Sequence, residues 1–260
     1  EHGTGLEGAC EAIYQFNVGL IDALCDIVPA VKPQSAYYEN LGWRGMEMLE
    51  RTIRYAKSKG LFVIADIKRG DIGTTATAYA EGWLSGVPVE GEVFKSFDAD
   101  CVTLNGYMGS DSINPFLKAA QGEDKCVFVL VKTSNPSSVE LQDMVAGDRV
   151  VYTVMGDLIE RWGKDTAGKY GYNALGAVVG ATHPSVLKEL RRRLEHTFFL
   201  VPGYGAQAPP PMCAAPLTSW AGGPSSTPPA PLCAPGKRPA RMAWTIRRPP
   251  GLPRSRCGTS

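Results

Sequence analysis

The sequence predicts an α/β protein, specifically a (β/α)₈ TIM barrel in which six of the eight strands can be recognised. Short, apolar, β-branched runs alternate with amphipathic helical segments, which is typical of parallel βα units. Charged and polar side chains follow several of these runs, and barrel enzymes place their active sites at the C-terminal ends of their strands. With 260 residues, 44% of them hydrophobic, the chain can form a sizeable core.

The first half of the chain predicts three of the six strands and the helices between them. Residues 6–27 form an amphipathic helix, because their apolar positions follow the 3.6-residue period. Helices are also expected at 43–59, from about Ala76 with Thr74 or Thr75 as the cap, and at 90–97. The strands are expected at 28–36, 61–67 and 101–105.

The second half predicts the other three strands by the same alternation. Pro184 stands where a helix begins, since proline is favoured in the first helical turn. Helices are expected at 113–121, 150–164 and 184–195, and strands at 126–131, 175–180 and 198–201.

The segment 63–79, VIADIKRGDIGTTATAY, contains the chemically most distinctive cluster. Asp66 and Lys68 are two residues apart on a strand, so both side chains leave the same face near the strand's C-terminal end. Gly70 allows a turn, and Asp71 follows three residues after Lys68. One cation is thus flanked by two anions, a pattern that fits either a structural ion pair or a catalytic group.

The string DIKRGDIGTTATAY, residues 66–79, resembles the signature of orotidine 5′-phosphate decarboxylases. The segment 31–39, VKPQSAYYE, is similar to a motif of the bacterial type 2 branch of that family, and the resemblance extends from about Gly5 to Gln207. It implies a TIM barrel that converts orotidine 5′-phosphate into uridine 5′-phosphate in de novo pyrimidine biosynthesis. It also implies that the reaction uses no metal and no other cofactor.

The resemblance implies roles for particular residues. Lys68 would protonate a C6 carbanion as general acid, Asp66 would lie near the substrate carboxylate, and Lys32 would orient Asp66 and a ribose hydroxyl. The family acts as a homodimer, in which Asp71 and Thr75, together with Ile72, would complete the neighbouring subunit's site. Residues matching the remaining substrate contacts are Ser134 for the pyrimidine ring and Gln207 for the phosphate, with Gly205 allowing close backbone approach.

Two alternatives remain open on the sequence. The first is a magnesium-dependent sugar-phosphate lyase or decarboxylase of the same barrel superfamily, which shares the D-x-K-x-x-D pattern; Lys32 argues against it, because a cation there does not suit a metal site. The second is an inactive fragment. The family's first-strand aspartate and its phosphate-binding arginine have no match in this chain, which begins inside the helix that follows the first strand.

The composition divides the chain into a barrel domain, 1–207, and a tail, 208–260. The tail holds 13 of the 20 prolines, seven basic residues and no acidic residue, so disorder is expected there. A shifted reading frame is one hypothesis for this composition, and the coding DNA read in its other frames would test it. Residues 1–207 therefore contain 20 of the 27 basic residues and all 26 acidic residues, which gives them a net charge of −6.

Composition also bounds the partners. The basic tail lacks interleaved aromatic residues and amphipathic periodicity, so nucleic acid is not expected as a partner. No apolar run reaches the roughly 20 residues of a membrane span, so no membrane association is expected. The seven scattered cysteines form no C-x-x-C pair and are expected to be reduced thiols. A cytoplasmic protein with a small nucleotide substrate is therefore expected.

Overall fold

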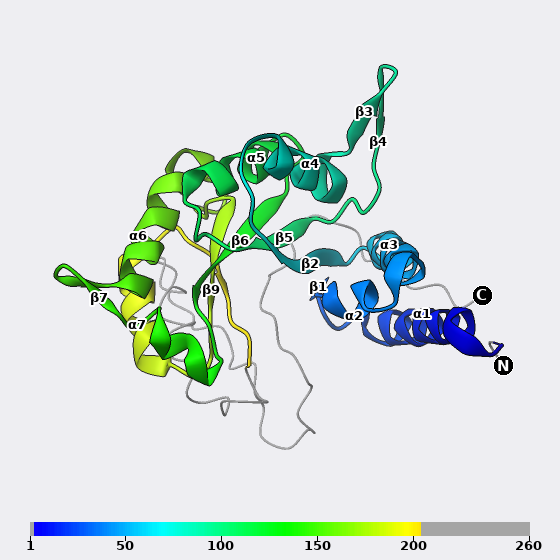
Figure 1. Ribbon diagram of the computed structural model, residues 1–260, viewed down its shortest axis with the longest axis horizontal. Helices are drawn as coiled ribbons and strands as arrows, with labels where there is room; N and C mark the ends of the chain where they lie inside the picture. The colour runs from blue at the N-terminus through cyan, green and yellow to red at the C-terminus, as the bar shows by residue number, and fades with distance from the viewer. Residues whose placement is uncertain (1–2, 204–260) are drawn as a thin grey trace, which may run out of the picture. The chain divides into compact units, whose positions relative to one another are not determined.

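The computed structural model describes residues 3–203 of the chain (Figure 1). These residues form two compact units, 3–128 and 129–203. The predicted domain boundary after Gln207 and the tail 208–260 lie outside the described residues.

The first unit is built on parallel strands in the order β1 (Ala30–Val31), β2 (Phe62–Arg69) and β5 (Cys101–Leu104), followed by the start of β6 (Cys126–Lys132). Ala30 pairs with Phe62 and Ile64 pairs with Cys101. All four strands overlap the ranges that the sequence predicts, although β1 covers only two residues of the predicted 28–36 and residue 36 begins a helix. The parallel arrangement places the C-terminal ends of β1, β2 and β5 at one edge of the sheet.

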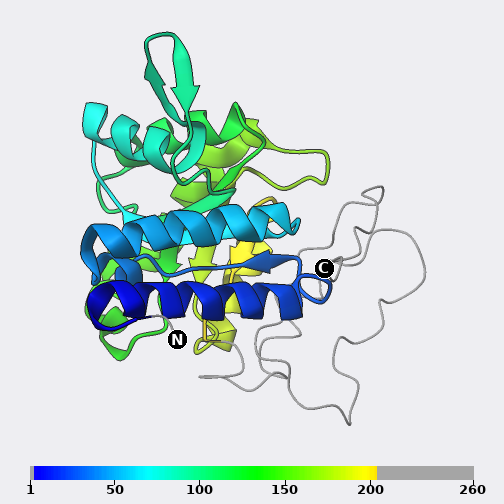
Figure 2. The same ribbon diagram turned by 90° about the vertical axis from the view of Figure 1, so that its right-hand side faces the viewer.

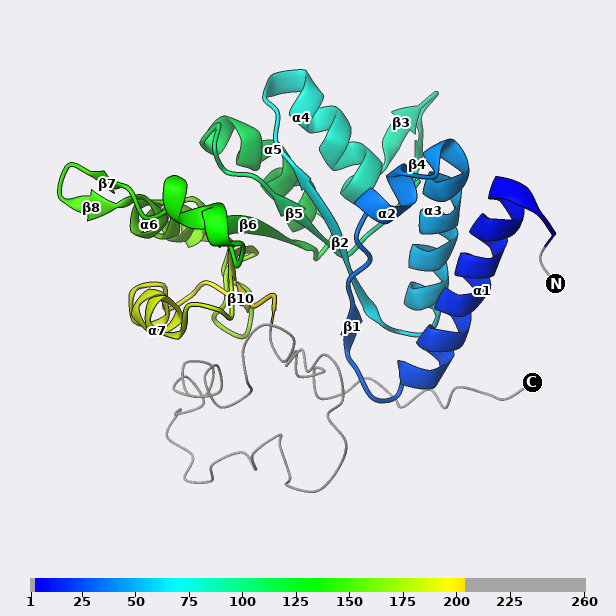
Figure 3. The ribbon, with the colours of Figure 1, turned by 60° about the horizontal axis from the view of Figure 1, so that its bottom comes forward.

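Helices cover this sheet. They are α1 (Gly5–Leu24), α2 (Ala36–Glu39), α3 (Gly42–Ser58), α4 (Gly73–Ala80) and α5 (Ser110–Gln121), with a π-helical turn, η1 (Glu81–Ser85), after α4. Figure 3 shows α1 lying alongside α3. Fully buried apolar side chains from helices and strands form the core of the unit, among them Leu49, Ile53, Ile64, Leu84, Leu104, Ile113 and Phe116.

Two local predictions in this unit were wrong. The segment 90–97 is not a helix, because β3 (Val87–Val89) and β4 (Glu92–Phe94) form an antiparallel hairpin that projects from the unit (Figure 2). Its turn residues Glu90 and Gly91 both have positive φ, 52° and 90°, which suits a tight hairpin turn and not a helix. Helix α4 begins at Gly73 after Ile72, so neither Thr74 nor Thr75 caps it.

The second unit contains the end of β6, then β9 (Leu175–Val179) and β10 (Phe199–Leu200), again parallel and in that order. Its helices are α6 (Val151–Gly163) and α7 (Pro184–Arg193), where the structure confirms the predicted helices. Shorter elements complete the unit: the 3₁₀ turns η2 (Pro136–Glu140) and η3 (Lys164–Thr166), and the hairpin of β7 (Val145–Ala146) and β8 (Arg149–Val150).

The predictions made for the cysteines were only partly right. Cys10, Cys101 and Cys126 are free thiols, as expected, whereas Cys25 is disulfide-bonded, which contradicts the expectation for that residue. Within residues 3–203, no helix is long and apolar enough to cross a membrane.

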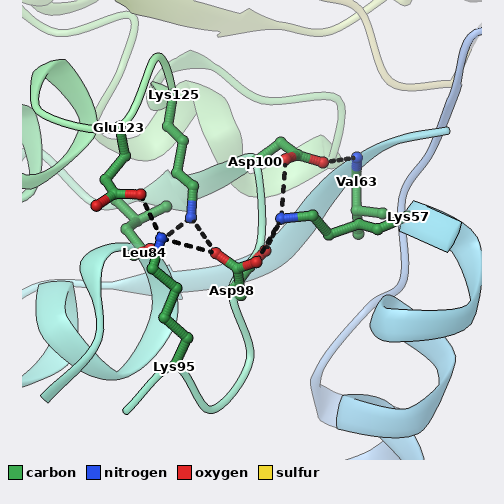
Figure 4. A network of polar contacts seen from close by, with 8 residues as sticks. All are labelled: Lys57, Val63, Leu84, Lys95, Asp98, Asp100, Glu123 and Lys125. Carbon is green, nitrogen blue, oxygen red and sulfur yellow. Dashed lines mark hydrogen bonds and ion pairs between the residues drawn. The ribbon is translucent and has the colours of Figure 1, made fainter. Parts of the chain in front are cut away.

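A polar network joins the N-terminal ends of the strands in the first unit (Figure 4). The carboxylate of Asp98 accepts hydrogen bonds from Lys57 Nζ at 2.7 Å and from Lys125 Nζ at 2.6 Å. Lys57 also pairs with Asp100, whose second oxygen accepts the backbone N–H of Val63 at 2.8 Å. The network therefore ties α3 to the starts of β2, β5 and β6.

Replacing Asp98 by asparagine should lower the free energy of unfolding at pH 7 by about 1–3 kcal/mol, because Lys125 and Lys57 lose their charged acceptor. Burial raises the pKa of Asp98, but the hydrogen bonds from Lys125 and Lys57 outweigh it and the pKa is lowered. The stabilisation is therefore present above the unfolded pKa of about 3.9 and is lost as the pH falls through the folded pKa.

Chemical denaturation of wild type and Asp98→Asn from pH 7 to pH 3 measures the lost free energy of unfolding and its dependence on pH. Asp124→Asn is the matched control, because Asp124 also has a positive φ, 54° against 48° at Asp98, but is exposed. An Asp98→Asn variant as stable as the control at pH 7 would contradict the role of the network.

Candidate active site

The backbone of β2 and the segment after β1 bring the predicted charged residues together. The N–H of Asp66 donates to Pro33 O at 3.0 Å, and the N–H of Ser35 donates to Asp66 O at 3.2 Å. Gln34 Nε2 also donates to Asp66 O at 2.9 Å. This pairing continues the β1–β2 ladder past Val31 and places Lys32 beside Asp66.

Asp66 is the centre of the site. Lys32 Nζ lies 2.7 Å from its Oδ2, and Lys68 Nζ lies 2.5 Å from its Oδ1. The side chain of Asp66 is 8% exposed, that of Lys32 19% and that of Lys68 44%. The carboxylate is therefore shielded from solvent, while the Lys68 ammonium that it binds remains accessible to a ligand.

The electrostatics favour an ionised carboxylate. Burial raises the pKa of Asp66, but the charge of Lys32 and the hydrogen bonds from Lys32, Lys68 and Thr103 together outweigh it, so the pKa is lowered. The ionised Asp66 forms ion pairs with the side-chain nitrogens of both lysines. The site therefore holds a fixed positive charge at Lys68.

The backbone at Lys68 departs from a regular strand. Its φ is +46°, in the left-handed region that non-glycine residues rarely occupy. The register between β2 and β5 shifts between Ala65 and Arg69, and the N–H of Lys68 donates to Thr103 Oγ1 at 3.0 Å. The prediction that Asp66 and Lys68 converge is confirmed by their ion pair, although the strand is irregular where they meet.

Asp71, Ile72 and Thr75 follow the turn at Gly70. The Asp71 carboxylate accepts the backbone N–H of Ile72 at 2.8 Å, and both Ile72 and Thr75 are exposed. Among the described residues, no hydrogen bond or ion pair joins Asp71 to Lys68. Within one chain, Lys68 thus contacts one of the two predicted anions, and a contact of Asp71 with a neighbouring subunit stays a prediction.

Ser134 lies in the second unit, just after β6. A Cβ on Gly180 would lie 2.9 Å from Ser134 N, so only glycine lets β9 approach the serine this closely. Lys132, the last residue of β6, is buried and pairs with Asp143 at 2.6 Å. The other two predicted substrate contacts, Gln207 and Gly205, lie outside the described residues.

Thr103 was missed from the sequence. It lies in the apolar run CVTL of β5, and its hydroxyl donates to Asp66 Oδ1 at 2.7 Å. The only available signal was one hydroxyl in a buried strand, and threonine is common in strands for reasons of packing alone. In the part of the chain that the structure describes, no three His, Cys, Asp or Glu side chains cluster as a metal site would require.

The sequence matches the family model described as "Orotidine 5'-phosphate decarboxylase / HUMPS family" over residues 16–211. Among curated relatives, orotidine 5′-phosphate decarboxylase of Clostridium perfringens is 43% identical over 198 residues, which is 76% of this chain and 66% of the relative. The Caldicellulosiruptor bescii enzyme of the same name is 42% identical over 195 residues, 75% of this chain and 64% of the relative. The chain thus spans slightly less than two thirds of their length.

Solved structures of similar proteins support the same fold. The Leishmania donovani OMP decarboxylase gives a TM-score of 0.65 at 37% identity, covering 76% of this chain and 70% of that one. A protein from Streptomyces avermitilis, described as a putative orotidine 5′-phosphate decarboxylase, gives a TM-score of 0.67 at 34% identity. The match covers 80% of this chain and 69% of that one. The predicted TIM-barrel class is thereby confirmed, and the described residues supply parallel strands and helices of that fold.

Replacing Asp66 by asparagine should lower the free energy of unfolding at pH 7 by about 2–4 kcal/mol, because Lys32 and Lys68 would face each other without an anion. The pKa of Asp66 is lowered in the folded state. Its contribution is therefore complete above the unfolded pKa of about 3.9 and disappears as the pH falls through the folded pKa.

Urea unfolding of both proteins between pH 7 and pH 2 measures this difference. Asp124→Asn is again the control, because Asp124 is exposed and lies outside the proposed site. If the difference in the free energy of unfolding between wild type and Asp66→Asn stayed constant over the whole pH range, the ionised carboxylate would be ruled out as its source.

Proposed function

The chain belongs to the orotidine 5′-phosphate decarboxylase / HUMPS family, and we propose that it removes carbon dioxide from orotidine 5′-phosphate to give uridine 5′-phosphate. The observation that supports this most directly is the half-exposed Lys68 ammonium bound to the buried Asp66 carboxylate. A fixed cation that can reach a ligand is what this decarboxylation requires, since the departing carbon dioxide leaves an electron pair on C6 of the pyrimidine.

In the proposed reaction the bond between C6 and the carboxylate carbon breaks, and carbon dioxide leaves. The electron pair stays on C6, where the positive charge of Lys68 stabilises it. A proton then moves from Lys68 Nζ to C6, and solvent returns a proton to the amine. All electrons are accounted for without a metal or another cofactor.

Asp66 and Lys32 would prepare Lys68 for this step. Asp66 holds the Lys68 ammonium in place through their ion pair, and its own charge would lie near the substrate carboxylate. Lys32 Nζ, 2.7 Å from Asp66 Oδ2, would fix the second carboxylate oxygen and donate to a ribose hydroxyl. Ser134 for the pyrimidine, and Gln207 and Gly205 for the phosphate, remain proposals that depend on the sequence resemblance.

We also propose a homodimer in which Asp71 and Thr75, with Ile72, contribute to the neighbouring subunit's site. The exposure of Ile72 and Thr75 supports this, as does the absence of a contact between Asp71 and Lys68 among the described residues of one chain. The barrel domain would comprise residues 1–207. Since substrate and product are both free nucleotides, we place the reaction of pyrimidine biosynthesis in the cytoplasm.

The magnesium-dependent lyase of the same superfamily is the second candidate. Lys32 speaks against it, because its ammonium lies on Asp66 Oδ2, where a metal ion would need a free carboxylate oxygen. An inactive chain is the third possibility, since the sequence spans 64–66% of its curated relatives' length. One assay separates all three.

The purified chain should form uridine 5′-phosphate from orotidine 5′-phosphate, measured by ultraviolet absorbance and chromatography. Addition of EDTA should leave the rate unchanged. Lys68→Ala should reduce kcat by about 10³-fold or more, because both the stabilising charge and the proton donor are lost. A folded chain that forms no product would favour the inactive reading, and activity that EDTA removes and magnesium restores would favour the lyase.

Mixing two inactive variants tests the shared site. Lys68→Ala and Asp71→Asn each disable every site of their own dimers, but a mixed dimer contains one site with both native residues. An equimolar mixture should therefore recover about one quarter of the wild-type activity after subunit exchange. Lys68→Ala mixed with Lys32→Ala, two changes within the same proposed half-site, is the control. Recovery in neither mixture would contradict a shared site.

A further inference from the structure

Thr103 is a buried polar residue that lies outside the signature 66–79 and contacts both Asp66 and Lys68. The residue is 1% exposed on β5. Its hydroxyl oxygen accepts the backbone N–H of Lys68 at 3.0 Å, and the hydroxyl donates to Asp66 Oδ1 at 2.7 Å. A hydroxyl has a single proton to donate, so an ionised Asp66 fixes its direction.

The contact with Lys68 explains how an irregular strand is tolerated at this point. Where the register between β2 and β5 shifts, the left-handed backbone of Lys68 departs from the regular ladder. The Thr103 hydroxyl gives the Lys68 N–H a partner there. A buried amide without a partner is costly, so this hydroxyl helps to maintain a conformation that non-glycine residues rarely adopt.

The contact with Asp66 fixes the orientation of the carboxylate. Oδ1 receives both the Thr103 hydroxyl and Lys68 Nζ, while Oδ2 receives Lys32 Nζ. The charged groups that contact the carboxylate are therefore Lys32, from the segment after β1, and Lys68, from β2. Thr103, from β5, is the neutral contact that determines how Oδ1 points towards Lys68.

We propose that Thr103 is a positioning residue for the decarboxylation: one hydroxyl holds the backbone of Lys68 and the carboxylate of Asp66 in the geometry that directs the Lys68 ammonium to its ligand. This inference rests on the proposed function, because it names the residue that aligns the proposed general acid. Thr103 does not itself need to contact the substrate. Its removal should therefore affect kcat more than KM.

Thr103→Val is the main variant, because valine keeps the branched shape and loses only the hydroxyl. We expect kcat to fall by about 10- to 100-fold, with KM changed by less than about 3-fold, as misplacement of a catalytic group predicts. Thr103→Ser keeps the hydroxyl and should retain kcat within about 3-fold of wild type. Thr153→Val is the matched control: it removes another buried hydroxyl, which donates to Val150 O in the second unit, and should leave kcat unchanged.

A second measurement does not depend on turnover. The carboxyl carbon of Asp66, followed by NMR during a pH titration, reports its pKa directly. Because the hydrogen bond from Thr103 is one of the contacts that lower this pKa, Thr103→Val should raise it and Thr103→Ser should not. If Thr103→Val does not fold, Thr103→Cys replaces the hydroxyl by a weaker donor and should show the same changes to a smaller degree.

The outcomes separate the two proposals. A wild-type chain without activity, whose Asp66 pKa nevertheless depends on the Thr103 hydroxyl, would overturn the proposed function and retain the positioning contact. An active chain in which Thr103→Val matches wild type in both kcat and Asp66 pKa would overturn the positioning role alone. Equal reductions of kcat in Thr103→Val and Thr103→Ser would also overturn the positioning role. So would a Thr103→Val variant in which KM rises and kcat is unchanged.

Discussion

The site depends on one buried carboxylate bound by two lysines. Removing Asp66 from water costs free energy, and that cost is offset only because both of its oxygens have charged partners at hydrogen-bonding distance. The requirement constrains three neighbouring segments. The segment after β1 must continue along β2 to supply Lys32, β2 must bend to bring Lys68 back onto Asp66, and β5 must supply the hydroxyl of Thr103.

A second carboxylate, Asp98, has a comparable arrangement at the opposite ends of the same strands (Figure 4). It too accepts hydrogen bonds from two lysines, Lys57 and Lys125, and it too has neighbours on several elements. The two clusters differ in exposure of their cations. Lys125 is buried and also donates to a backbone carbonyl, whereas Lys68 is 44% exposed. The first arrangement suits a structural link, and the second leaves an ammonium available for chemistry.

Family membership and activity have different support. Membership follows from a match over residues 16–211 and from relatives more than 40% identical, whereas catalysis by this chain also requires substrate contacts beyond Asp66, Lys68 and Lys32. Binding energy from the phosphate of the substrate is spent at the reacting carbon in such chemistry. The residues proposed to contact that phosphate, Gln207 and Gly205, follow β10 in the sequence and lie outside the described part of the chain.

The sequence by itself determined the βα order, the positions of the six parallel strands among the described residues, and the identity of the charged cluster. Hydrophobic periodicity and the spacing of Asp66 and Lys68 are local properties, and they can be read from consecutive residues. The sequence-based prediction of a helix at 90–97 was wrong, because two turn residues with positive φ form a hairpin there.

Only the tertiary structure decided which distant groups meet Asp66. Thr103 is 37 residues away, and nothing in the sequence marked its contact with Asp66. Lys32 is 34 residues away, and no local pattern marks its contact, which was expected only from the family resemblance. Their approach follows from the pairing of β1, β2 and β5 and from the register shift at Lys68. The same holds for Lys132, a charged residue that is buried and paired with Asp143 in the fold. A side chain's partners depend on strand pairing, which brings together residues that the chain order keeps apart.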